Sequence, residues 1–342
     1  MTDAAIDCRH LWKIFGARER EALDAAHNGA GKDDIREKYG CVVGVADVCF
    51  TVRPGEIFCV MGLSGSGNST MVRHLNRLIE PTAGEVFIGG RDVNKLDAAE
   101  LRALRSGKIG MVFQNMALLP HRTVVEYVAL PLELRGIDVK KRHALAEKKL
   151  ALVELTGWSN RYPDELSGGM KQRVGLARAM AADPDILLMD EPFSALDPLI
   201  RRQLQDQFIE LAKVLKKTTV FITHDLDEAI RLGDHIAIMK DGCVVQIGTP
   251  EDIVTAPADD YVADFVAGVS RLSLVTAARI MQPISGPGGD LRAAPRVAPT
   301  ATLDALVDIA CDTDSPIVVA EGDGLLGYIS KRSLLKGIQG RA

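Results

Sequence analysis

A glycine-rich loop at residues 62–70, which reads GLSGSGNST, constrains the fold of this chain more than any other feature. Gly62, Gly67 and Ser69 fit the phosphate-binding pattern G-x-x-x-x-G-K-[ST], but Asn68 stands in place of the lysine. The apolar run IFCVM at 57–61 predicts a buried strand before the loop, and residues 71–78 predict a helix after it. Such a strand, loop and helix point backbone N–H groups at one anion. We therefore expect an α/β fold with a phosphate site.

The residues that we expect to line this site are Gly62, Ser64, Gly65, Ser66, Gly67, Asn68, Ser69 and Thr70. A lysine at position 68 would place a positive charge on the outer phosphates, whereas Asn68 supplies hydrogen bonds without charge. The missing charge weakens the binding of nucleotide in the ground state by roughly 1.5–3 kcal/mol, the value of a hydrogen bond to a charged group. The loss of stabilisation is larger in the transition state of hydrolysis, because negative charge is redistributed on the phosphates there. We expect weakened nucleotide binding and strongly reduced turnover.

Composition limits the class of protein. A length of 342 residues predicts two or three domains, and 47% hydrophobic with 25% charged residues is typical of globular proteins. The net charge of −5 argues against a nucleic-acid-binding protein, which would usually be basic. The six cysteines form no C-x-x-C pair, which indicates a reducing compartment. With no apolar run of membrane-spanning length, we expect any membrane contact to come through a partner.

A second motif, ILLMDE at 186–191, is an apolar run that ends in two carboxylates. A buried parallel strand that ends in this way delivers both acids to the carboxyl edge of the sheet, where α/β folds bind ligands. Asp190 is the candidate Mg²⁺ ligand. Glu191 is the candidate general base for an attacking water.

A third motif, LSGG at 166–169, precedes a helical pattern. Ser167 is a suitable helix N-cap. Gly168 and Gly169 leave backbone N–H groups open to an anion at the helix start. Together with the first two motifs, this stretch is predicted to be a second phosphate-contacting element.

In chain order, the loop at 62–70, LSGG at 166–169 and ILLMDE at 186–191 resemble the ATPase subunit of ABC transporters, and the resemblance covers about residues 6–268. The resemblance implies that ATP and Mg²⁺ are bound. It makes Gln114 in MVFQ the Q-loop residue, Asp197 in SALD the D-loop residue and His224 in FITHD the switch histidine. Phe15 takes the position of the aromatic that stacks on adenine, with Trp12 as the alternative.

The roles implied by this resemblance fall into three groups. The catalytic residues are Glu191, His224 and Gln114, the Mg²⁺ ligands are Ser69, Gln114 and Asp190, and the nucleotide contacts beyond the loop are Phe15, Ser167, Gly168, Gly169 and Asp197. In this family the Ser-Gly-Gly helix start of one copy caps the nucleotide held by the loop of another. The expected assembly is therefore a homodimer with two ATP sites.

Longer stretches, such as MVRHLNRLIEPT and FSALDPLIR, resemble the glycine betaine/proline (quaternary amine) importer ATPases. This implies integral-membrane permease subunits as partners, a solute-binding protein as an indirect partner, and no nucleic acid. It also implies a peripheral location on the cytoplasmic face of the inner membrane. The charged insert between Gly16 and Gly44 is expected to form a helical hairpin on the surface.

The expected architecture is a P-loop NTPase (RecA-like) core with an inserted α-helical subdomain and a small α+β domain at the C-terminus. Residues 1–270 are expected to form the ATP-binding domain, with the helical subdomain at about 96–165, where Leu145, Leu152 and Leu155 predict one apolar face. Residues 271–342 resemble a linker and a single CBS repeat, a module that reports ionic strength in related importers. Its sequence Ser330-Lys331-Arg332-Ser333 lacks the acid of the ribose-contacting pattern.

Three functions fit these features. The first is the ATPase that energises a quaternary-amine importer. The second is a hydrolysis-impaired subunit or variant that acts as a nucleotide-binding or regulatory partner, since Asn68 replaces the loop lysine. The third is a soluble ABC ATPase of translation or DNA repair, which would predict tandem cassettes or a coiled-coil insertion. We favour the first.

Overall fold

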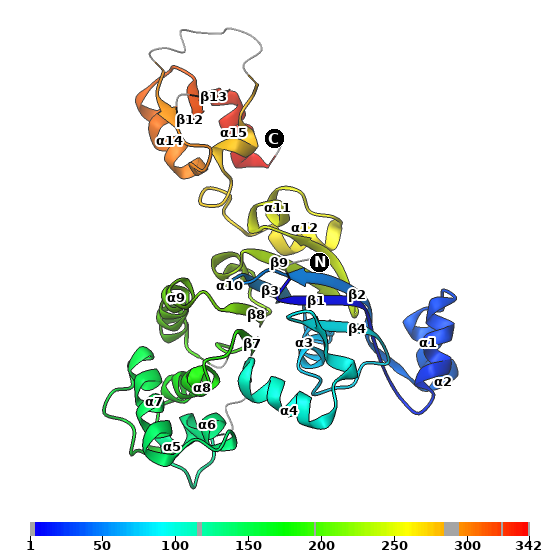
Figure 1. Ribbon diagram of the computed structural model, residues 1–342. Helices are drawn as coiled ribbons and strands as arrows, with labels where there is room; N and C mark the ends of the chain where they lie inside the picture. Colours follow the sequence, from blue (N-terminus) through cyan, green and yellow to red (C-terminus); the bar gives the residue numbers. More distant parts are fainter. Residues whose placement is uncertain (1–3, 115–117, 195, 284–293, 323, 341–342) are drawn as a thin grey trace. The chain divides into compact units, whose positions relative to one another are not determined.

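A computed structural model describes residues 4–114, 118–194, 196–283, 294–322 and 324–340 of the chain (Figure 1). Residues 284–293 of the expected linker and Ala195 of the SALD motif thus lie outside the described residues. The chain divides into two compact units, 1–247 and 248–342. Within the described part of the chain, no helix is both long and apolar enough to cross a membrane.

A six-stranded sheet with the order β10-β9-β3-β8-β7-β6 forms the centre of the first unit. Its strands are β3 (Ile57–Met61), β6 (Ile109–Val112), β7 (Ile186–Asp190), β8 (Thr218–Thr223), β9 (His235–Lys240) and β10 (Cys243–Gly248). The pairs that join β6, β7, β8, β3 and β9 are parallel. β7 and β8 are buried along their whole length, as parallel strands covered on both faces are. This sheet brings the ends of β3, β7 and β8 to one edge.

A four-stranded antiparallel sheet has the order β2-β1-β4-β5. Its strands are β1 (Ile6–Phe15), β2 (Val42–Val52), β4 (Ala83–Ile88) and β5 (Arg91–Asp92), and the 3-10 turn η1 (Val93–Lys95) follows. Helix α3 (Asn68–Leu75) joins the two sheets, because Met71, Val72 and Leu75 belong to one buried cluster with residues of both. The strand expected at 57–61 is confirmed. The helix expected at 71–78 instead ends at Leu75, since Arg77 adopts a left-handed backbone conformation.

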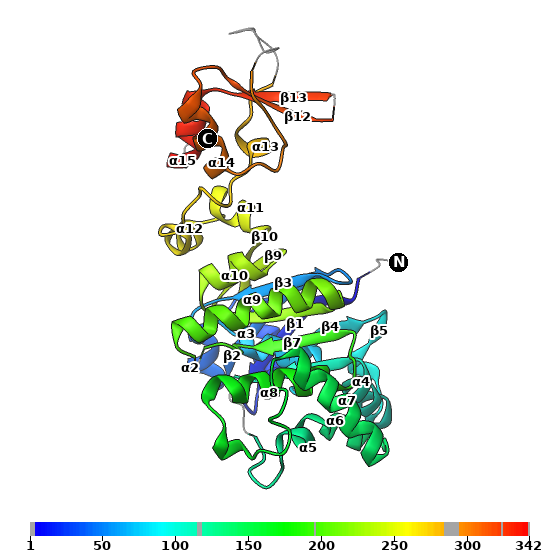
Figure 2. The same cartoon turned by 90° about the vertical axis from the view of Figure 1, so that its left-hand side faces the viewer.

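The remaining helices of the first unit include a group around α8 (Figure 2). Their bounds are α4 (Ala98–Gly107), α5 (Val124–Val128), α6 (Leu130–Leu134), α7 (Val139–Leu152), the 3-10 turn η2 (Pro163–Glu165), α8 (Gly168–Ala181), α9 (Pro198–Leu215) and α10 (Leu226–Leu232). Helices α5, α6 and α7 pack against α8. By contrast, Leu104 of α4 is buried in the main core with the two sheets.

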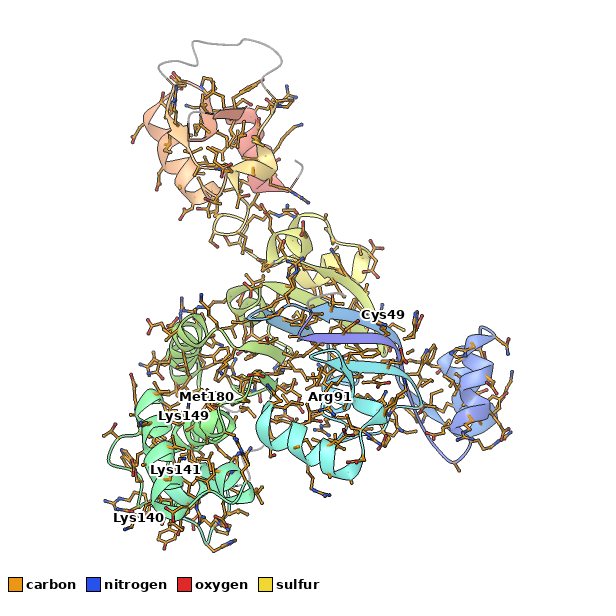
Figure 3. The ribbon with its side chains drawn as sticks, in the orientation of Figure 1. Cys49, Arg91, Lys140, Lys141, Lys149 and Met180 are labelled. Atoms are coloured by element: carbon orange, nitrogen blue, oxygen red, sulfur yellow. The ribbon has the colours of Figure 1, made fainter. Side chains whose placement is uncertain are left out.

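The apolar face expected from Leu145, Leu152 and Leu155 is only partly present. Leu155 is buried, but Leu152 is 46% exposed. Helix α7 ends at Leu152, so Leu155 lies in the following turn and the helical spacing does not continue to it. Lys140 and Lys141 are exposed on the first turn of α7 (Figure 3).

The insert between β1 and β2 forms a pair of helices, as expected. They are α1 (Glu19–His27) and α2 (Lys32–Tyr39). Ala22 of α1 and Ile35 of α2 share a small buried cluster with Ile14 and Val43 of the neighbouring strands. The hairpin therefore has its own packed base on the antiparallel sheet.

The second unit has its own core and a three-stranded sheet in the order β11-β12-β13. Its elements are α11 (Pro250–Thr255), α12 (Asp260–Val266), α13 (Ala277–Ile280), β11 (Arg296–Val297), α14 (Leu303–Asp312), β12 (Ile317–Glu321), β13 (Gly324–Ile329) and α15 (Lys331–Gln339). Leu303 and Leu306 of α14 pack with Ile317 and Val319 of β12. The sequence places a boundary at 270/271, whereas the contacts group residues 248–270 with the C-terminal part.

Candidate functional site

The phosphate loop leaves the end of β3, which is paired on one side with β8 and on the other with β9. Gly67 has a φ of +94°, and a Cβ there would lie 2.2 Å from the carbonyl oxygen of Gly44. A Cβ on Gly62 would meet the Ser66 hydroxyl at 2.3 Å. The Ser66 Oγ is itself buried and has no hydrogen-bond partner among the described residues. The glycines thus allow a tight loop with a free donor in it.

Asn68 turns back onto its own loop. Its side chain is buried, and its Oδ1 accepts a hydrogen bond of 2.7 Å from the backbone N–H of Ser69. Its Nδ2 lies 3.5 Å from the Gly62 carbonyl oxygen. The amide therefore adds no charge to the site and also occupies a backbone donor at the start of α3, where a phosphate would be held.

The end of β7 meets the start of α3. The Ser69 hydroxyl donates a 2.7 Å hydrogen bond to Asp190 Oδ1, and Asp190 is 1% exposed. Hydroxyl and carboxylate oxygens are ligands that Mg²⁺ prefers, and neighbouring ligands of an octahedral Mg²⁺ lie roughly 2.9 Å apart. The two oxygens therefore fit a Mg²⁺ site by chemistry and by spacing.

Two candidate catalytic side chains converge on one carboxylate oxygen of a third. Gln114 Nε2 donates to Glu191 Oε2 at 3.0 Å, and His224 Nδ1 lies 3.1 Å from the same oxygen. They follow β6, β7 and β8, which are adjacent in the sheet. Glu191 has a φ of +46°, a conformation uncommon for a side chain of this size. The parallel sheet thus brings together residues that are far apart in the sequence.

The Ser-Gly-Gly motif lies on a different element. Ser167 is the N-cap of α8, and its hydroxyl accepts a 3.3 Å hydrogen bond from the Met170 N–H. Ser167 and Gly168 are exposed, and a Cβ on Gly168 would meet nothing within 4 Å. Helix α8 packs among α5, α6 and α7 rather than against α3 (Figure 1). Its open start is therefore free to meet another molecule.

Phe15 lies close to the phosphate loop, whereas Trp12 does not. A Cβ on Gly44 would be 2.7 Å from the Phe15 ring, and the Gly44 carbonyl faces Gly67. The Phe15 ring is 41% exposed. Trp12 is partly buried and packs edge-on against His27 of α1, with ring centroids 5.2 Å apart. Of the two aromatics, Phe15 has the free face next to the loop.

Comparison with known proteins agrees with this geometry. Residues 45–194 match a family model described as ABC transporter. The chain is 49% identical over 329 residues to the glycine betaine/proline betaine transport system ATP-binding protein ProV of Escherichia coli K12, covering 96% of this chain and 81% of the relative. The chain belongs to the ATP-binding subunits of the glycine betaine-type ABC importers.

Two further members of this wider family are informative. The trimethylamine N-oxide transport system ATP-binding protein TmoW of Ruegeria pomeroyi is 44% identical over 339 residues, covering 98% of this chain and 97% of its own length. A solved structure of the ABC cassette MJ0796, a dimer bound to ADP and Pi, superposes with a TM-score of 0.61 at 32% identity, covering 72% of this chain and 98% of that one. The fold is that of an ABC ATPase.

Within this ABC subunit, Asp197 has a local structural role. Its Oδ1 accepts a 3.1 Å hydrogen bond from the Ile200 N–H and so caps α9. The Asp197 side chain is exposed and has no hydrogen bond or ion pair with the phosphate loop among the residues that the structure describes. Ser64, Gly65 and Thr70 lie in the loop or at the first turn of α3, and Ser64 and Gly65 are exposed.

Sequence analysis missed Arg73. Its Nη2 lies 3.2 Å from Asp190 Oδ2, so Asp190 is held by a hydroxyl on one oxygen and a guanidinium on the other. Ser69 and Arg73 are four residues apart on α3, which places them on one face of the helix. This spacing is the signal that could have identified Arg73.

Proposed function

We propose that this protein binds and hydrolyses ATP to energise the uptake of a small osmolyte, of the glycine betaine, proline betaine, choline or proline class, through an ABC importer. The convergence of Gln114 and His224 on Glu191 beside the Ser69–Asp190 pair is the observation that supports hydrolysis best. The likeness to ProV over 96% of the chain supports the transported class.

In this proposal the first unit supplies one half of each ATP site. The loop N–H groups hold the phosphates, and Phe15 stacks on the base. Ser69, Asp190 and Gln114 would hold Mg²⁺, which would neutralise charge on the phosphates. Glu191 orients and deprotonates the attacking water, and His224 contacts the terminal phosphate. Gln114 and His224 support these roles by both contacting Oε2 of the Glu191 carboxylate.

The other half of each site comes from a second copy. Ser167, Gly168 and Gly169 lie at the exposed start of α8, and Asp197 lies at the exposed start of α9. A homodimer would place these helix starts over the partner's phosphate loop, where N–H groups favour an anion. ATP binding and release would then shift the dimer between closed and open states.

The permease is proposed to dock on an apolar groove of the first unit, at the cytoplasmic face of the membrane. The groove has a volume of about 580 Å³ and is lined by residues of α4, β6, α6 and α8, which include Pro131 and Leu134 of α6, and by Leu78 and Phe113 from the connecting segments. Leu134 is 76% exposed. Phe113 directly precedes Gln114, so a docked helix would contact the segment that reaches the catalytic carboxylate.

The transported compound is proposed from the relatives, since it is selected by other subunits. ProV is named for glycine betaine and proline betaine, and TmoW for trimethylamine N-oxide. These solutes share a methylated nitrogen, and TmoW matches this chain over nearly its whole length. Trimethylamine N-oxide is therefore the second compound to test.

Residues 271–342 are proposed to form a single CBS-like domain that modulates transport. A hollow of about 430 Å³ in this part is lined by Arg279, Arg332 and Lys336 together with Ser330 and Ser333. Three cationic side chains around one hollow give a surface whose interactions weaken as salt rises. This charge supports a response to ionic strength.

The test is uptake of radiolabelled glycine betaine by cells that carry this chain with its permease and solute-binding protein. ATP turnover is measured in parallel for the chain and its Asn68→Lys and Asn68→Ala variants. We expect Asn68→Lys to raise turnover at least about tenfold, because it restores the charge at the outer phosphates. Asn68→Ala frees the Ser69 N–H without adding charge, so it should raise ATP turnover much less than Asn68→Lys does.

Two results would contradict the proposal. If the Asn68→Lys chain supports no uptake of any methylated amine, the transport function is wrong. If Asn68→Lys raises turnover less than about tenfold, the electrostatic account of position 68 is wrong. A hydrolysis-impaired regulatory subunit predicts instead that uptake depends on a second, different ATPase chain.

A further inference from the structure

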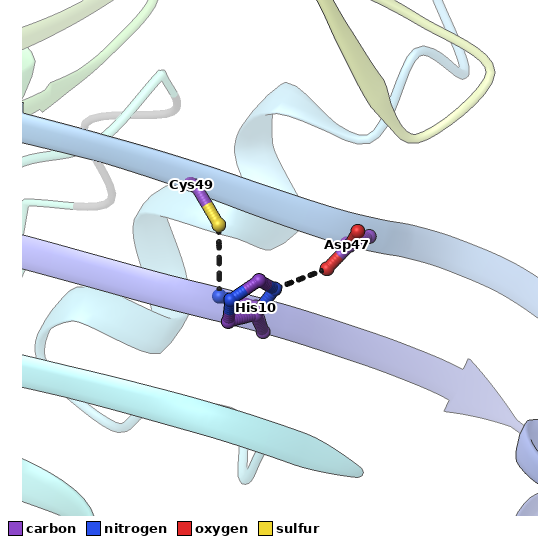
Figure 4. Close-up of side chains that lie close together, drawn as sticks. All are labelled: His10, Asp47 and Cys49. Atoms are coloured by element: carbon purple, nitrogen blue, oxygen red, sulfur yellow. Dashed lines mark hydrogen bonds and ion pairs between the residues drawn. The ribbon is translucent and has the colours of Figure 1, made fainter. Parts of the chain in front are cut away.

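Three side chains with metal-binding groups, none of them assigned to the ATP site, meet on the exposed face of the antiparallel sheet. They are His10 of β1 and Asp47 and Cys49 of β2 (Figure 4). His10 Nδ1 lies 2.8 Å from Asp47 Oδ1, and the backbone N–H of His10 donates to Cys49 Sγ at 3.1 Å. One ligand atom from each residue lies within 4.8 Å of the others.

The backbone holds these side chains on one face. Asp47 and Cys49 are two residues apart on β2 and both are exposed, while Val48 and Phe50 between and after them are buried. Alternation along a strand therefore points both ligands outward. The alternation that buries Val48 and Phe50 in the core also exposes Asp47 and Cys49, so the structure of the sheet determines that these two side chains share one face.

His10 reaches the pair because β1 is irregular at this point. His10 and Asp47 have φ values of +47° and +50°. The pairing of β1 with β2 shifts between Cys8 and Leu11, and its pairing with β4 shifts between Arg9 and Trp12. Left-handed residues in strands are uncommon and cost energy. Here two such residues, one on each of two paired strands, bring an imidazole and a carboxylate together.

The ligand set selects a class of metal. Imidazole, carboxylate and thiolate are the ligands of Zn²⁺, with bonds of about 2.0–2.3 Å, whereas Mg²⁺ and Ca²⁺ prefer oxygen alone. In a tetrahedral site such bonds separate the ligand atoms by roughly 3.3–3.8 Å. Atoms within 4.8 Å of one another reach that separation by side-chain rotation.

We propose that His10, Asp47 and Cys49 bind one Zn²⁺ ion, with water in the fourth position. Binding forms a zinc–sulfur bond and releases the Cys49 thiol proton to solvent. The ion would link β1 to β2, the two strands that carry Phe15 and Gly44. The alternative is an ordinary surface hydrogen bond between His10 and Asp47, which binds no metal.

Other cysteines of the chain provide the contrast. Burial raises the pKa of the Cys8 and Cys59 thiols, which disfavours the thiolate that a metal needs. Cys311 is exposed like Cys49 but belongs to the second unit. Cys311→Ser is therefore the matched control for Cys49→Ser.

The test is zinc titration of the metal-free full chain against a chromophoric chelator, with excess Mg²⁺ present to occupy the Ser69–Asp190 site. We expect one zinc ion per chain. The variants His10→Asn, Asp47→Asn and Cys49→Ser should each weaken zinc affinity at least about tenfold. Asparagine tolerates the left-handed conformation, so the first two variants preserve the backbone.

Cobalt provides a second readout that a merely structural effect would not produce. Co²⁺ bound to a thiolate gives a sulfur-to-metal charge-transfer band, and this band should disappear in Cys49→Ser and persist in Cys311→Ser. Zinc should also raise the thermal midpoint of the parent chain but not of Cys49→Ser. Absence of stoichiometric zinc binding, or an affinity and a cobalt band that survive all three substitutions, would overturn the proposal.

Discussion

At the residue scale, we expect position 68 to have the largest effect on how well this ABC subunit hydrolyses ATP. The usual lysine would add a charge, but Asn68 has none and its Oδ1 takes the Ser69 N–H. The neighbouring parts of the site are in place, because Ser69 meets Asp190 and Gln114 meets Glu191. Asparagine in place of lysine is therefore expected to weaken one interaction with phosphate, while the rest of the arrangement is intact.

The glycines of the loop give a second test at this scale. Both Gly65 and Gly67 have positive φ, but only Gly67 has a backbone atom where its Cβ would go. We expect Gly65→Ala to lower the free energy of unfolding by about 1–2 kcal/mol from backbone strain. Gly67→Ala should cost clearly more, since the Gly44 carbonyl must also move.

Urea unfolding of the two alanine variants, followed by circular dichroism, measures this difference. Gly65→Ala is the control for strain without a clash. Equal losses for both variants would contradict the steric account of Gly67.

At the element scale, helices α9 and α10 are joined by a buried carboxylate. Gln205 Nε2 of α9 donates to Glu228 Oε1 of α10 at 2.8 Å. Burial raises the pKa of Glu228 above its usual value, and hydrogen bonds from Thr223 and Gln205 only partly offset this. The charged form is thus disfavoured in the folded chain.

This shift predicts a pH dependence of stability. A carboxyl whose pKa is raised in the folded state stabilises the fold in its protonated form, and this stabilisation is lost as pH rises through the folded pKa. Glu228→Gln mimics the protonated form. The variant should match the parent in acid, below the usual glutamate range, and become more stable than the parent as pH rises. The measurement is the thermal midpoint of the parent and of Glu228→Gln at a series of pH values, from below the usual glutamate pKa upward. A difference between the two midpoints that stays constant with pH would contradict this prediction.

A second prediction at this scale concerns Leu134 of helix α6, which lines the groove proposed for permease docking. Leu134→Glu places a charge in the apolar groove proposed for the permease. We expect osmolyte uptake to fall at least about tenfold, because a buried unpaired charge costs several times RT. ATP turnover of the isolated subunit should change little, since Leu134 lies at the surface.

The matched control is Val214→Glu on α9, because Val214 is 78% exposed and lies outside that groove. It should leave both uptake and turnover near the parent values. A loss of uptake that is the same for both variants would argue against the groove as the docking surface.

At the scale of the whole molecule, each unit has its own core. The buried clusters of the first unit consist of residues before 248, and the cluster of the second consists of residues from Leu272 to Ile338. A change in one unit therefore removes no buried side chain from these clusters in the other unit. This separation is the physical basis for treating the C-terminal part as a modulator.

Deletion of residues 271–342 tests that role. We expect the shortened chain to retain ATP turnover and uptake, because the first unit keeps its core. Uptake should lose its dependence on salt concentration. The measurement is the rate of glycine betaine uptake over a range of ionic strengths. An unchanged salt dependence would defeat the proposal for this part of the chain.

Local patterns in the sequence determined the strand before the phosphate loop, the capped start of α8, the α1–α2 hairpin and the absent charge at Asn68. These features depend on neighbours along the chain, so periodicity and spacing reveal them. The end of α7 did not follow from the pattern, because the apolar spacing through Leu152 and Leu155 continues where the helix does not.

Only the tertiary structure decided which distant residues meet. The order of strands in the sheet brings Gln114, Glu191 and His224 to one oxygen, and Asp190 to Arg73. Packing against the α1–α2 hairpin separated Trp12 from Phe15, and two irregular strands brought His10 to Asp47, 37 residues away. Register and packing arise from the whole core at once, and no short stretch of sequence contains them.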